Sequence, residues 1–233
     1  KGYETVIIMP DSVSQERRLL VEHYGAKVIL IHDAGNIGDC IEECVRTATR
    51  MAAEDPRVFV PQQFENEANP MVHRHHTGLE ILEQVAGTIH GFCSGIGTGG
   101  TITGIGETLK ALNPDITIWA VEPENAAILA GGTVGTHIQM GIGDGVVPKV
   151  LNQHIYEDIA IISDEEALRT SRDLARLEGL MCGISSGTNV AAAIKMAKKL
   201  GKGKTVVTIL PDTAERYFST PLFESNLHAS MPA

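Results

Sequence analysis

Short runs of apolar residues alternate with longer segments of mixed polarity along the whole chain. This alternation is typical of a mostly parallel β-sheet whose strands are joined by helices. The apolar runs predict strands at residues 5–9, 27–32, 58–61, 88–94, 116–122, 159–163 and 205–210. The intervals predict a first helix that ends at residue 24 and further helices over residues 38–53, 69–85, 165–177 and 186–200. The pattern as a whole predicts an α/β fold.

Capping side chains and glycines mark the ends of the predicted helices. We expect Asp11 or Ser12 to cap the first helix, and Ser163 or Asp164 to cap the helix that ends before Gly179. The stretch 123–148 shows no helical or strand periodicity and is rich in glycine. It predicts a long loop, and long glycine-rich loops inside compact domains are often functional.

A turn rich in glycine and threonine, residues 95–104, lies between a predicted strand and a helix-like segment. Glycines allow successive backbone N–H groups to converge, and the N-terminus of the following helix adds partial positive charge there. Thr98 and Thr101 contribute hydroxyl donors. No lysine follows the glycines, so the pattern of nucleoside triphosphatases is not met. The turn therefore predicts a site for a small phosphate ester.

The same turn also satisfies the pattern of a dinucleotide-binding fold. Gly95, Gly97 and Gly100 have the spacing Gly-x-Gly-x-x-Gly. Glu122 ends the next predicted strand, where an acidic residue would bond a ribose hydroxyl. Gly99 and the threonines supply more donors than a pyrophosphate crossing needs, which favours the phosphate ester. A purely structural glycine turn is a third interpretation.

Two further polar clusters lie at the ends of predicted elements. Residues 183–188 precede a helix and form either an anion site or an ordinary helix cap. Residues 210–217 follow the last predicted strand at its carboxyl end, which is the edge where open α/β sheets bind ligands. Glu215 and Arg216 in this cluster are also compatible with a structural ion pair.

Composition and charge narrow the classes of partner. The chain has 233 residues, 43% of them hydrophobic, and a formal net charge of −10. Such a charge repels the backbone of a nucleic acid, and no stripe of lysine and arginine is present. No apolar run reaches the roughly 20 residues that span a bilayer, and no signal-peptide cleavage pattern follows the first residues. We expect a soluble cytoplasmic protein with no nucleic-acid or membrane partner.

The cysteines and histidines do not have the spacing of metal ligands. Neither Cys-x-x-Cys pairing nor the density of a disulfide scaffold is found among Cys40, Cys44, Cys93 and Cys182. We expect free thiols, with the first two packed in the core. The histidines at positions 73, 75 and 76 do not form His-Glu-x-x-His, which favours a mostly solvated helix face. We expect no metal.

The order of these motifs resembles that of the cysteine synthases, the O-acetylserine sulfhydrylases among the fold-type II pyridoxal-phosphate enzymes. The matching motifs are residues 95–101, Gly141-Ile142-Gly143, residues 183–187, Leu210-Pro211-Asp212, residues 215–217, Met9-Pro10 with residues 16–18, and residues 61–64 with Asn69-Pro70 and His73. They span essentially the whole chain. The resemblance implies three layers, with mostly parallel sheets and helices on both faces. It also implies that residues 1–66 belong to a smaller mobile domain and residues 67–233 form the larger domain with the phosphate-binding loop.

The resemblance further implies roles for individual residues toward pyridoxal 5'-phosphate and an amino-acid substrate. The implied cofactor-binding residues are Gly97, Thr98, Gly99, Gly100 and Thr101 around the phosphate, Ser185 at the pyridine nitrogen, and Gly141 beside the ring. The implied substrate-binding residues are Gln63, Phe64 and Ile142. A neutral serine hydroxyl leaves the ring nitrogen largely unprotonated, which suits β-elimination.

The chain also departs from the family pattern. The family sequence Gln-Gly-Ile-Gly-Ala-Gly reads Met140-Gly141-Ile142-Gly143-Asp144-Gly145, and Gly-Glu-Arg reads Ala214-Glu215-Arg216. The first change leaves the amino donor and the nucleophile open. The family's Schiff-base lysine and its Thr-Ser-Gly-Asn-Thr-Gly loop have no counterpart here, so we assign no catalytic residue. We expect a cleaved or truncated product that lacks turnover on its own.

The resemblance implies a cysteine synthase-like reaction, in which O-acetylserine and sulfide give cysteine and acetate. Two other interpretations remain open at this point. One is a cystathionine β-synthase-like reaction with homocysteine, and the other is a non-catalytic module that binds a peptide or phosphate ligand. The resemblance also implies a homodimer, and it makes the C-terminal tail of a serine acetyltransferase a candidate partner.

Overall fold

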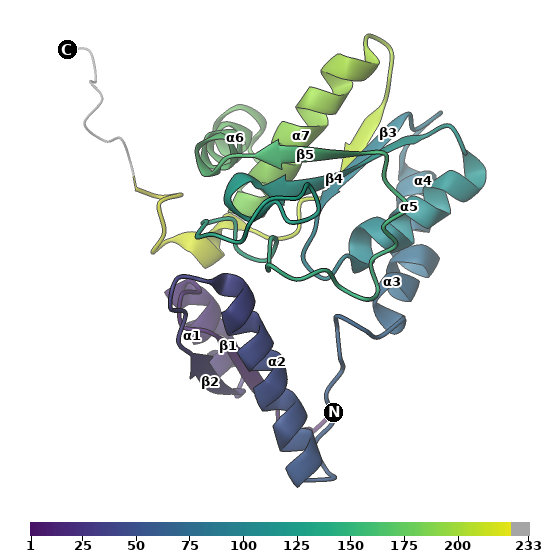
Figure 1. Cartoon of the computed structure of the whole chain (residues 1–233). Coiled ribbons are helices and arrows are strands. Elements are labelled where there is room, and N and C mark those ends of the chain that lie inside the picture. The colour runs from purple at the N-terminus through teal and green to yellow at the C-terminus, as the bar shows by residue number, and fades with distance from the viewer. Residues whose placement is uncertain (225–233) are drawn as a thin grey trace, which may run out of the picture.

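The computed structural model describes residues 1–224, and two parallel β-sheets organise them (Figure 1). In the smaller sheet β1 (Val6–Pro10) pairs with β2 (Lys27–Ile31). The larger sheet has the order β5 (Asp158–Ile162), β4 (Thr117–Pro123), β3 (Gly91–Gly95) and β6 (Val206–Thr208). Every pairing is parallel, which confirms the predicted α/β fold with mostly parallel sheets.

Two helices pack on the smaller sheet. Helix α1 (Gln15–His23) contacts β2, and α2 (Ile37–Glu54) contacts β1. The apolar side of α2 buries Cys40, Cys44 and Thr47, which are three or four residues apart and therefore share one face.

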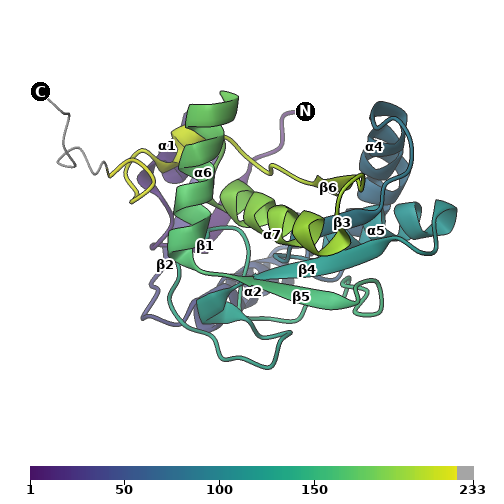
Figure 2. The same ribbon diagram turned by 90° about the horizontal axis from the view of Figure 1, so that it is seen from above.

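The larger sheet is the middle of three layers (Figure 2). One face is covered by α6 (Asp164–Glu178) and α7 (Ile184–Leu200). The other face is covered by α5 (Gly100–Leu112), which packs against α3 (Ala68–Val72), the π-helical turn η1 (His73–Thr77) and α4 (Gly78–Gln84). Cys93 and Trp119 contribute to the core under α6 and α7, whereas Phe92 and Ile118 contribute to the core under α5. The alternation follows from the two-residue period of a strand and confirms the predicted three layers.

Predicted helix ends are confirmed in one case and wrong in another. The hydroxyl of Ser163 accepts the backbone N–H of Glu166 at 3.2 Å, as predicted for the cap of α6. Helix α1, in contrast, begins after Ser14, because the hydroxyl of Ser12 donates to Asp33 at 2.7 Å instead of capping the helix.

The structure corrects three further element predictions. Residues 58–61 form no strand, and Phe59 is 82% exposed, so this short run has no sheet to join. The single helix predicted over 69–85 is divided by the π-helical turn η1. Strand β6 is also shorter than the predicted 205–210. The stretch after β4 is mainly loop, as predicted, with one short 3-10 helix, η2 (Glu124–Ala126).

The first helix is joined to a segment almost two hundred residues later. That segment contains the 3-10 helix η3 (Ala214–Tyr217), which contacts α1. The hydroxyl of Ser14 donates to the backbone oxygen of Arg216 at 2.6 Å, and the carboxylate of Glu16 accepts the N–H of Ser219 at 3.0 Å. The smaller sheet is therefore connected to the larger one through side chains of α1. Within residues 1–224, no helix has both the length and the apolar character needed to cross a membrane.

Candidate functional site

The turn that connects β3 to α5 is shaped for an anion. Gly99 precedes the helix with φ of +79°, a left-handed conformation that favours glycine, and a Cβ there would stand 2.8 Å from the Cβ of Leu151. The first N–H groups of α5 have no acceptor within the helix and carry the positive end of its dipole. Thr98 lies two residues before the start of α5, and Thr101 is the second residue of this helix. The predicted phosphate donors are thus gathered at one helix N-terminus.

The long loop packs directly against this turn. The N–H of Gly143 donates to the backbone oxygen of Ile96 at 2.8 Å. A Cβ at Gly97 would stand 2.5 Å from the oxygen of Gly141, and a Cβ at Gly95 would stand 2.9 Å from a methyl group of Ile142. The structure therefore brings Gly141 and Ile142 to the turn.

Asp144 lies on the same loop, at the position where the family pattern has alanine. Its Oδ2 is 3.6 Å from the place of a Cβ at Gly97. Burial raises the pKa of this carboxyl group, while His137 and Arg17 act to lower that pKa. The loop departure thus places an ionisable group beside the phosphate turn.

The segment that carries Gln63 and Phe64 reaches the turn through Asn69. The side-chain nitrogen of Asn69 donates to the backbone oxygen of Gln63 at 2.8 Å and to Oγ1 of Thr98 at 2.9 Å. Phe64 is partly buried, and its backbone oxygen accepts the N–H of Val150 at 3.2 Å. Gln63 itself is exposed.

Ser185 lies buried in the first turn of α7. Asn189 follows one helical turn later on the same face. Its Oδ1 accepts the N–H of Gly95 at 2.7 Å, and its Nδ2 donates to the oxygen of Ile209 at 2.8 Å. The face of α7 that carries Ser185 therefore meets the carboxyl end of β3, where the phosphate turn begins.

Asp212 connects this first turn of α7 to α1. Its Oδ2 accepts from Arg17 at 3.1 Å and from the hydroxyl of Tyr217 at 2.7 Å. Its backbone oxygen accepts the N–H of Gly183 at 3.0 Å, and a Cβ at Gly183 would clash with its Oδ1. That Oδ1 is buried without a partner in the described part of the chain. Residues 183–188 and 210–217 thus form one cluster.

Glu215 and Arg216, which belong to the second of these segments, form the predicted ion pair, at 3.7 Å.

His73 departs from the predicted solvated face. His75 and His76 are exposed, but His73 is partly buried, and burial lowers its pKa. Its Nε2 lies 3.3 Å from Oγ1 of Thr101, and its Nδ1 lies 3.1 Å from Oγ1 of Thr77. The contact between His73 and Thr101 was not predicted from the sequence. The only signal for it was the spacing of four residues between His73 and Asn69, which contacts the other threonine of the turn.

Glu122 is not available to a dinucleotide. It is 2% exposed, and its carboxylate accepts the backbone N–H groups of Leu129 at 3.0 Å and Ala130 at 3.1 Å. Because this carboxylate holds the start of the long loop, it cannot serve a ribose hydroxyl without breaking that loop. The dinucleotide interpretation loses its acidic residue.

No group of three or more metal-ligating side chains comes together within residues 1–224. The four cysteines are buried free thiols, as predicted, and burial raises the pKa of Cys44 to about 12 and of Cys93 to about 11.

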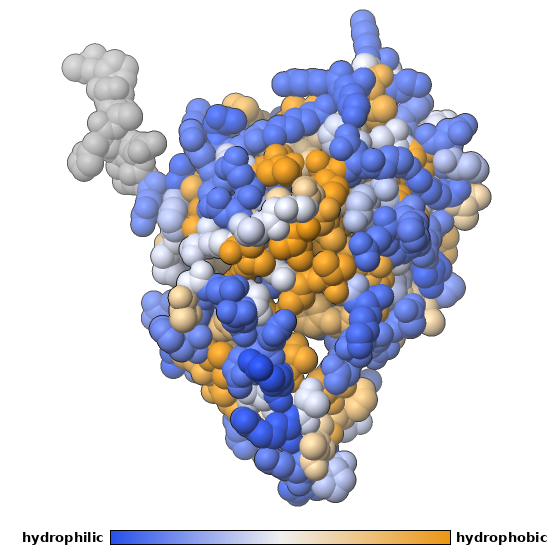
Figure 3. Space-filling view, in the orientation of Figure 1, coloured by the Kyte–Doolittle hydropathy of each residue, from blue (hydrophilic) through white to orange (hydrophobic). Residues whose placement is uncertain are grey.

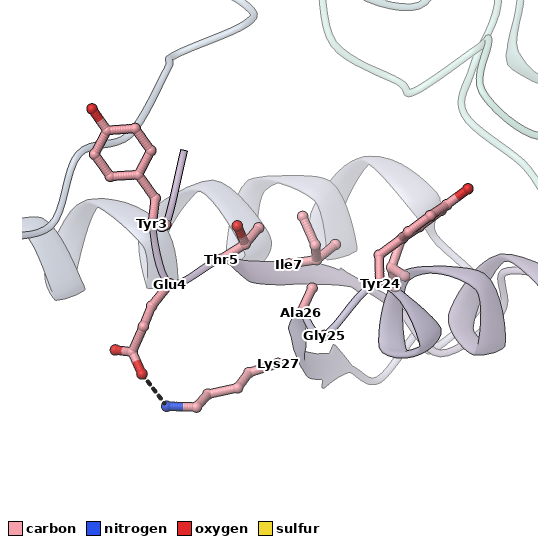
Figure 4. A pocket seen from close by; sticks show the side chains of 10 residues that line it. Tyr3, Glu4, Thr5, Ile7, Tyr24, Gly25, Ala26 and Lys27 are labelled. Atoms are coloured by element: carbon pink, nitrogen blue, oxygen red, sulfur yellow. Dashed lines mark hydrogen bonds and ion pairs between the residues drawn. The ribbon is translucent and has the colours of Figure 1, made fainter.

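A hollow of about 440 Å³ lies beside the smaller sheet, near the N-terminal end of β1, and Tyr3 and Tyr24 are among the residues that line it (Figure 4). Glu4 and Lys27 at its rim pair with each other at 3.4 Å, so their charges are not directed at a ligand.

The residues at the turn fit the phosphate of a cofactor. Gly97 and Gly99 leave no room for a Cβ, and a side chain at Gly100 would clash with Asn69. Backbone N–H groups, two hydroxyls and a helix N-terminus together form a donor set for a dianion. The residues that could therefore hold a phosphate monoester are Gly97, Thr98, Gly99, Gly100 and Thr101. The fold and the turn define the class: an α/β protein with a set of phosphate-binding donors at the carboxyl edge of a parallel sheet.

Comparison with known proteins identifies the family. A family profile described as "Pyridoxal-phosphate dependent enzyme" matches residues 1–212, and the chain belongs to this family. It is 46% identical over 224 residues to a cysteine synthase of Staphylococcus aureus, which covers 96% of this chain and 71% of that protein. The predicted cofactor, pyridoxal phosphate, is thereby confirmed.

Solved structures agree with this assignment. The crystal structure of an O-ureido-L-serine synthase superimposes with a TM-score of 0.89 at 38% identity, covering 98% of this chain and 71% of that one. The O-acetylserine dependent cystathionine β-synthase of Helicobacter pylori also reaches a TM-score of 0.89, at 34% identity over 94% of this chain and 70% of that one. The fold-type II architecture is thereby confirmed.

Proposed function

We propose that this chain carries the cofactor site and part of the substrate site of a cysteine synthase-like enzyme, which converts O-acetylserine and sulfide to cysteine and acetate. The observation that carries the proposal is the closure of the phosphate turn by two other segments. Gly141 and Ile142 approach it from one side, and Asn69 ties Gln63 to it from another. The 46% identity to a cysteine synthase supports this choice of reaction.

Each group at the site has a proposed task. Residues 97–101 bind and orient the phosphate, and the hydroxyl of Ser185 shares a hydrogen bond with the pyridine nitrogen. Gln63, Phe64 and Ile142 position the amino-acid substrate. Bound pyridoxal phosphate supplies the electron sink that allows a group on the substrate β-carbon to leave.

We further propose that residues 1–233 do not turn over substrate by themselves, because the reaction needs an amine that bonds to the cofactor. Several lysines are held in ion pairs with carboxylates elsewhere, namely Lys27 with Glu4, Lys110 with Glu157, Lys149 with Glu65, Lys195 with Glu166 and Lys199 with Asp158. The test is to incubate the purified chain with pyridoxal phosphate, O-acetylserine and sulfide. Formation of cysteine would refute this part of the proposal.

A cystathionine β-synthase-like reaction is the second candidate. The likeness to the Helicobacter pylori enzyme and the carboxyl group of Asp144 beside the turn favour keeping it. A panel of nucleophiles, tested on the chain together with a polypeptide that supplies the family's Schiff-base lysine, distinguishes the two reactions. Preference for sulfide supports the first reaction, and preference for homocysteine supports the second. Binding without either product would indicate a non-catalytic module.

We also propose a cytoplasmic homodimer in which a smaller mobile domain, residues 1–66, moves relative to a larger domain, residues 67–233. An apolar area on the face shown in Figure 3, together with Val147 at 48% exposure in the loop between β4 and β5, supports self-association. Light scattering after size-exclusion chromatography tests the dimer, and a monomer would contradict it. A peptide from the C-terminus of a serine acetyltransferase tests the proposed partner, and lack of binding would count against it.

A further inference from the structure

A polar pair on the α3–η1 stretch serves the two threonines of the phosphate turn. Asn69 and His73 are four residues apart, so they lie on the same face of this stretch. Asn69 contacts Thr98, and His73 contacts Thr101. This arrangement matters because a threonine hydroxyl has a single proton, and its direction decides whether the group donates to a ligand.

The contacts of Thr98 determine the direction of its hydroxyl proton. The backbone oxygen of Gln63 can only accept, so the amide group of Asn69 must present its nitrogen there, at 2.8 Å. The same nitrogen lies 2.9 Å from Oγ1 of Thr98, and the N–H of Gly100 points to that oxygen at 3.5 Å. Both contacts bring hydrogens to the oxygen. The proton of Thr98 is therefore left for another acceptor.

The contacts of Thr101 allow two arrangements. In one, Nε2 of His73 carries the hydrogen and donates to Thr101, while Nδ1 accepts from Thr77; the distances are 3.3 and 3.1 Å. In the other arrangement, Nδ1–H donates to Thr77, and the hydroxyl of Thr101 donates its proton to Nε2. Only the first arrangement leaves the proton of Thr101 for the turn. Burial lowers the pKa of His73, so the ring is neutral and has one acceptor and one donor nitrogen.

We propose that Asn69 and His73 are positioning residues that direct the hydroxyl protons of Thr98 and Thr101 toward the cofactor phosphate. The proposal rests on the phosphate turn proposed above and adds the layer that orients it. A dianion has no proton to donate, so its binding improves when every surrounding hydroxyl is already a donor. The entropy cost of ordering the two hydroxyls then arises when the protein folds, and it does not weaken the binding of the phosphate.

The packing of the stretch supports such a rigid layer. A Cβ at Gly104 of α5 would clash with the backbone oxygen of Pro70 and stand 2.7 Å from the Cβ of His73. A Cβ at Gly78 would stand 2.8 Å from the Cβ of Thr108. Two glycines thus allow α5 and the α3–α4 stretch to approach closely, which holds both positioning side chains against the turn.

The tautomer of His73 provides a test that needs no substitution. Nitrogen-15 NMR of the 233-residue chain, saturated with inorganic phosphate, distinguishes a protonated Nε2 from a protonated Nδ1. We expect a neutral ring with the hydrogen on Nε2. A hydrogen on Nδ1, or a charged ring at pH 7.5 or so, would overturn the role of His73.

A double-mutant cycle tests both residues by affinity. Asn69→Ala and His73→Ala should each weaken pyridoxal phosphate and inorganic phosphate about tenfold in calorimetric titrations, since each loses one well-directed donor to a charged group. Asn69→Ala should cause no further loss of affinity in a protein that already carries Thr98→Val. His73→Ala should likewise cause no further loss in a protein that carries Thr101→Val. Pyridoxal, which lacks the phosphate, should bind all variants alike. The exposed His75, changed to alanine, is the matched control.

The outcomes separate this inference from the function on which it rests. If Thr98→Val and Thr101→Val leave phosphate affinity unchanged, the proposed phosphate turn itself is wrong. If they weaken binding, but the alanine variants have no effect or keep their full effect in the valine backgrounds, the turn stands and the positioning role is wrong.

Discussion

Asp144 places an ionisable carboxyl group beside the phosphate turn, residues 97–101. Its carboxyl group lies close to Gly97, in a loop that also brings Gly141 to the turn. A carboxylate next to a bound dianion is repelled, and burial already disfavours its charged form. Protonation of Asp144 therefore relieves both penalties, and we expect it to bind a proton when the site fills.

Asp144→Asn should make the folded protein more stable at neutral pH. A carboxyl group whose pKa is raised by folding binds more protons in the folded state than in the unfolded state. Its contribution to the free energy of unfolding therefore falls as the pH rises from the pKa of the unfolded state through the pKa of the folded state. The variant lacks this loss. Thermal unfolding should show a melting temperature a few degrees above the parent at pH 7.5 or so, and no difference at about pH 3. The exposed Asp115, changed to asparagine, is the control, and an equal gain at both pH values would contradict the account.

The sequence predicted which residues gather at the site better than it predicted how they are held. The glycine and threonine pattern at 97–101 is local, so it can be recognised without a structure. The contacts that Asn69 and His73 make with Thr98 and Thr101 join positions about 30 residues apart and arise only from tertiary packing. The tasks of these residues toward the cofactor remain predictions.

At the scale of elements, local signals succeeded where packing did not override them. Ser163 and Gly179 mark the ends of α6 as predicted, because capping is a local property. Residues 58–61 have the composition of a strand but find no neighbouring strand. The turn η1 interrupts a helical pattern that the sequence presents as continuous, and it lies where the chain packs against α5.

Ser163→Ala should remove the cap of α6. The hydroxyl satisfies the N–H of Glu166 at 3.2 Å, and losing an N-cap acceptor costs about 1 kcal/mol of unfolding free energy. Urea denaturation measures the loss as a lower midpoint with an unchanged slope. Ser163→Asp keeps an acceptor and should retain the parental midpoint. Equal midpoints for the alanine variant and the parent would show that the cap contributes nothing.

At the scale of the whole molecule, one cluster connects the two sheets. Arg17 of α1 donates to Asp212 at 3.1 Å and to the hydroxyl of Tyr217 at 2.5 Å, and its guanidinium lies 5.2 Å from the centre of the Tyr217 ring. Asp212 also holds the first turn of α7, which carries Ser185. The relative placement of the two sheets and the placement of Ser185 therefore depend on the same residue, the first through its carboxylate and the second through its backbone oxygen.

Arg17→Ala should loosen residues 1–66 from the rest of the chain. The change leaves the partly buried Asp212 without its cation, which costs about 1–3 kcal/mol for a charged hydrogen bond of this kind. Hydrogen exchange should become faster in α1 and in η3, while α5 remains protected. Arg18→Ala removes only an exposed pair with Glu22 and is the matched control. Unchanged exchange in the Arg17 variant would show that this cluster does not hold the two parts together.

The most direct test of the central claim is a crystal structure of the chain with pyridoxal phosphate bound. The account predicts a phosphate group within hydrogen-bond distance of the backbone N–H groups of residues 97–101 and of the hydroxyls of Thr98 and Thr101. It also predicts that the ring nitrogen faces Ser185 and that Gly141 lies along the ring. A phosphate held at any other place, with the turn left empty, would contradict the account.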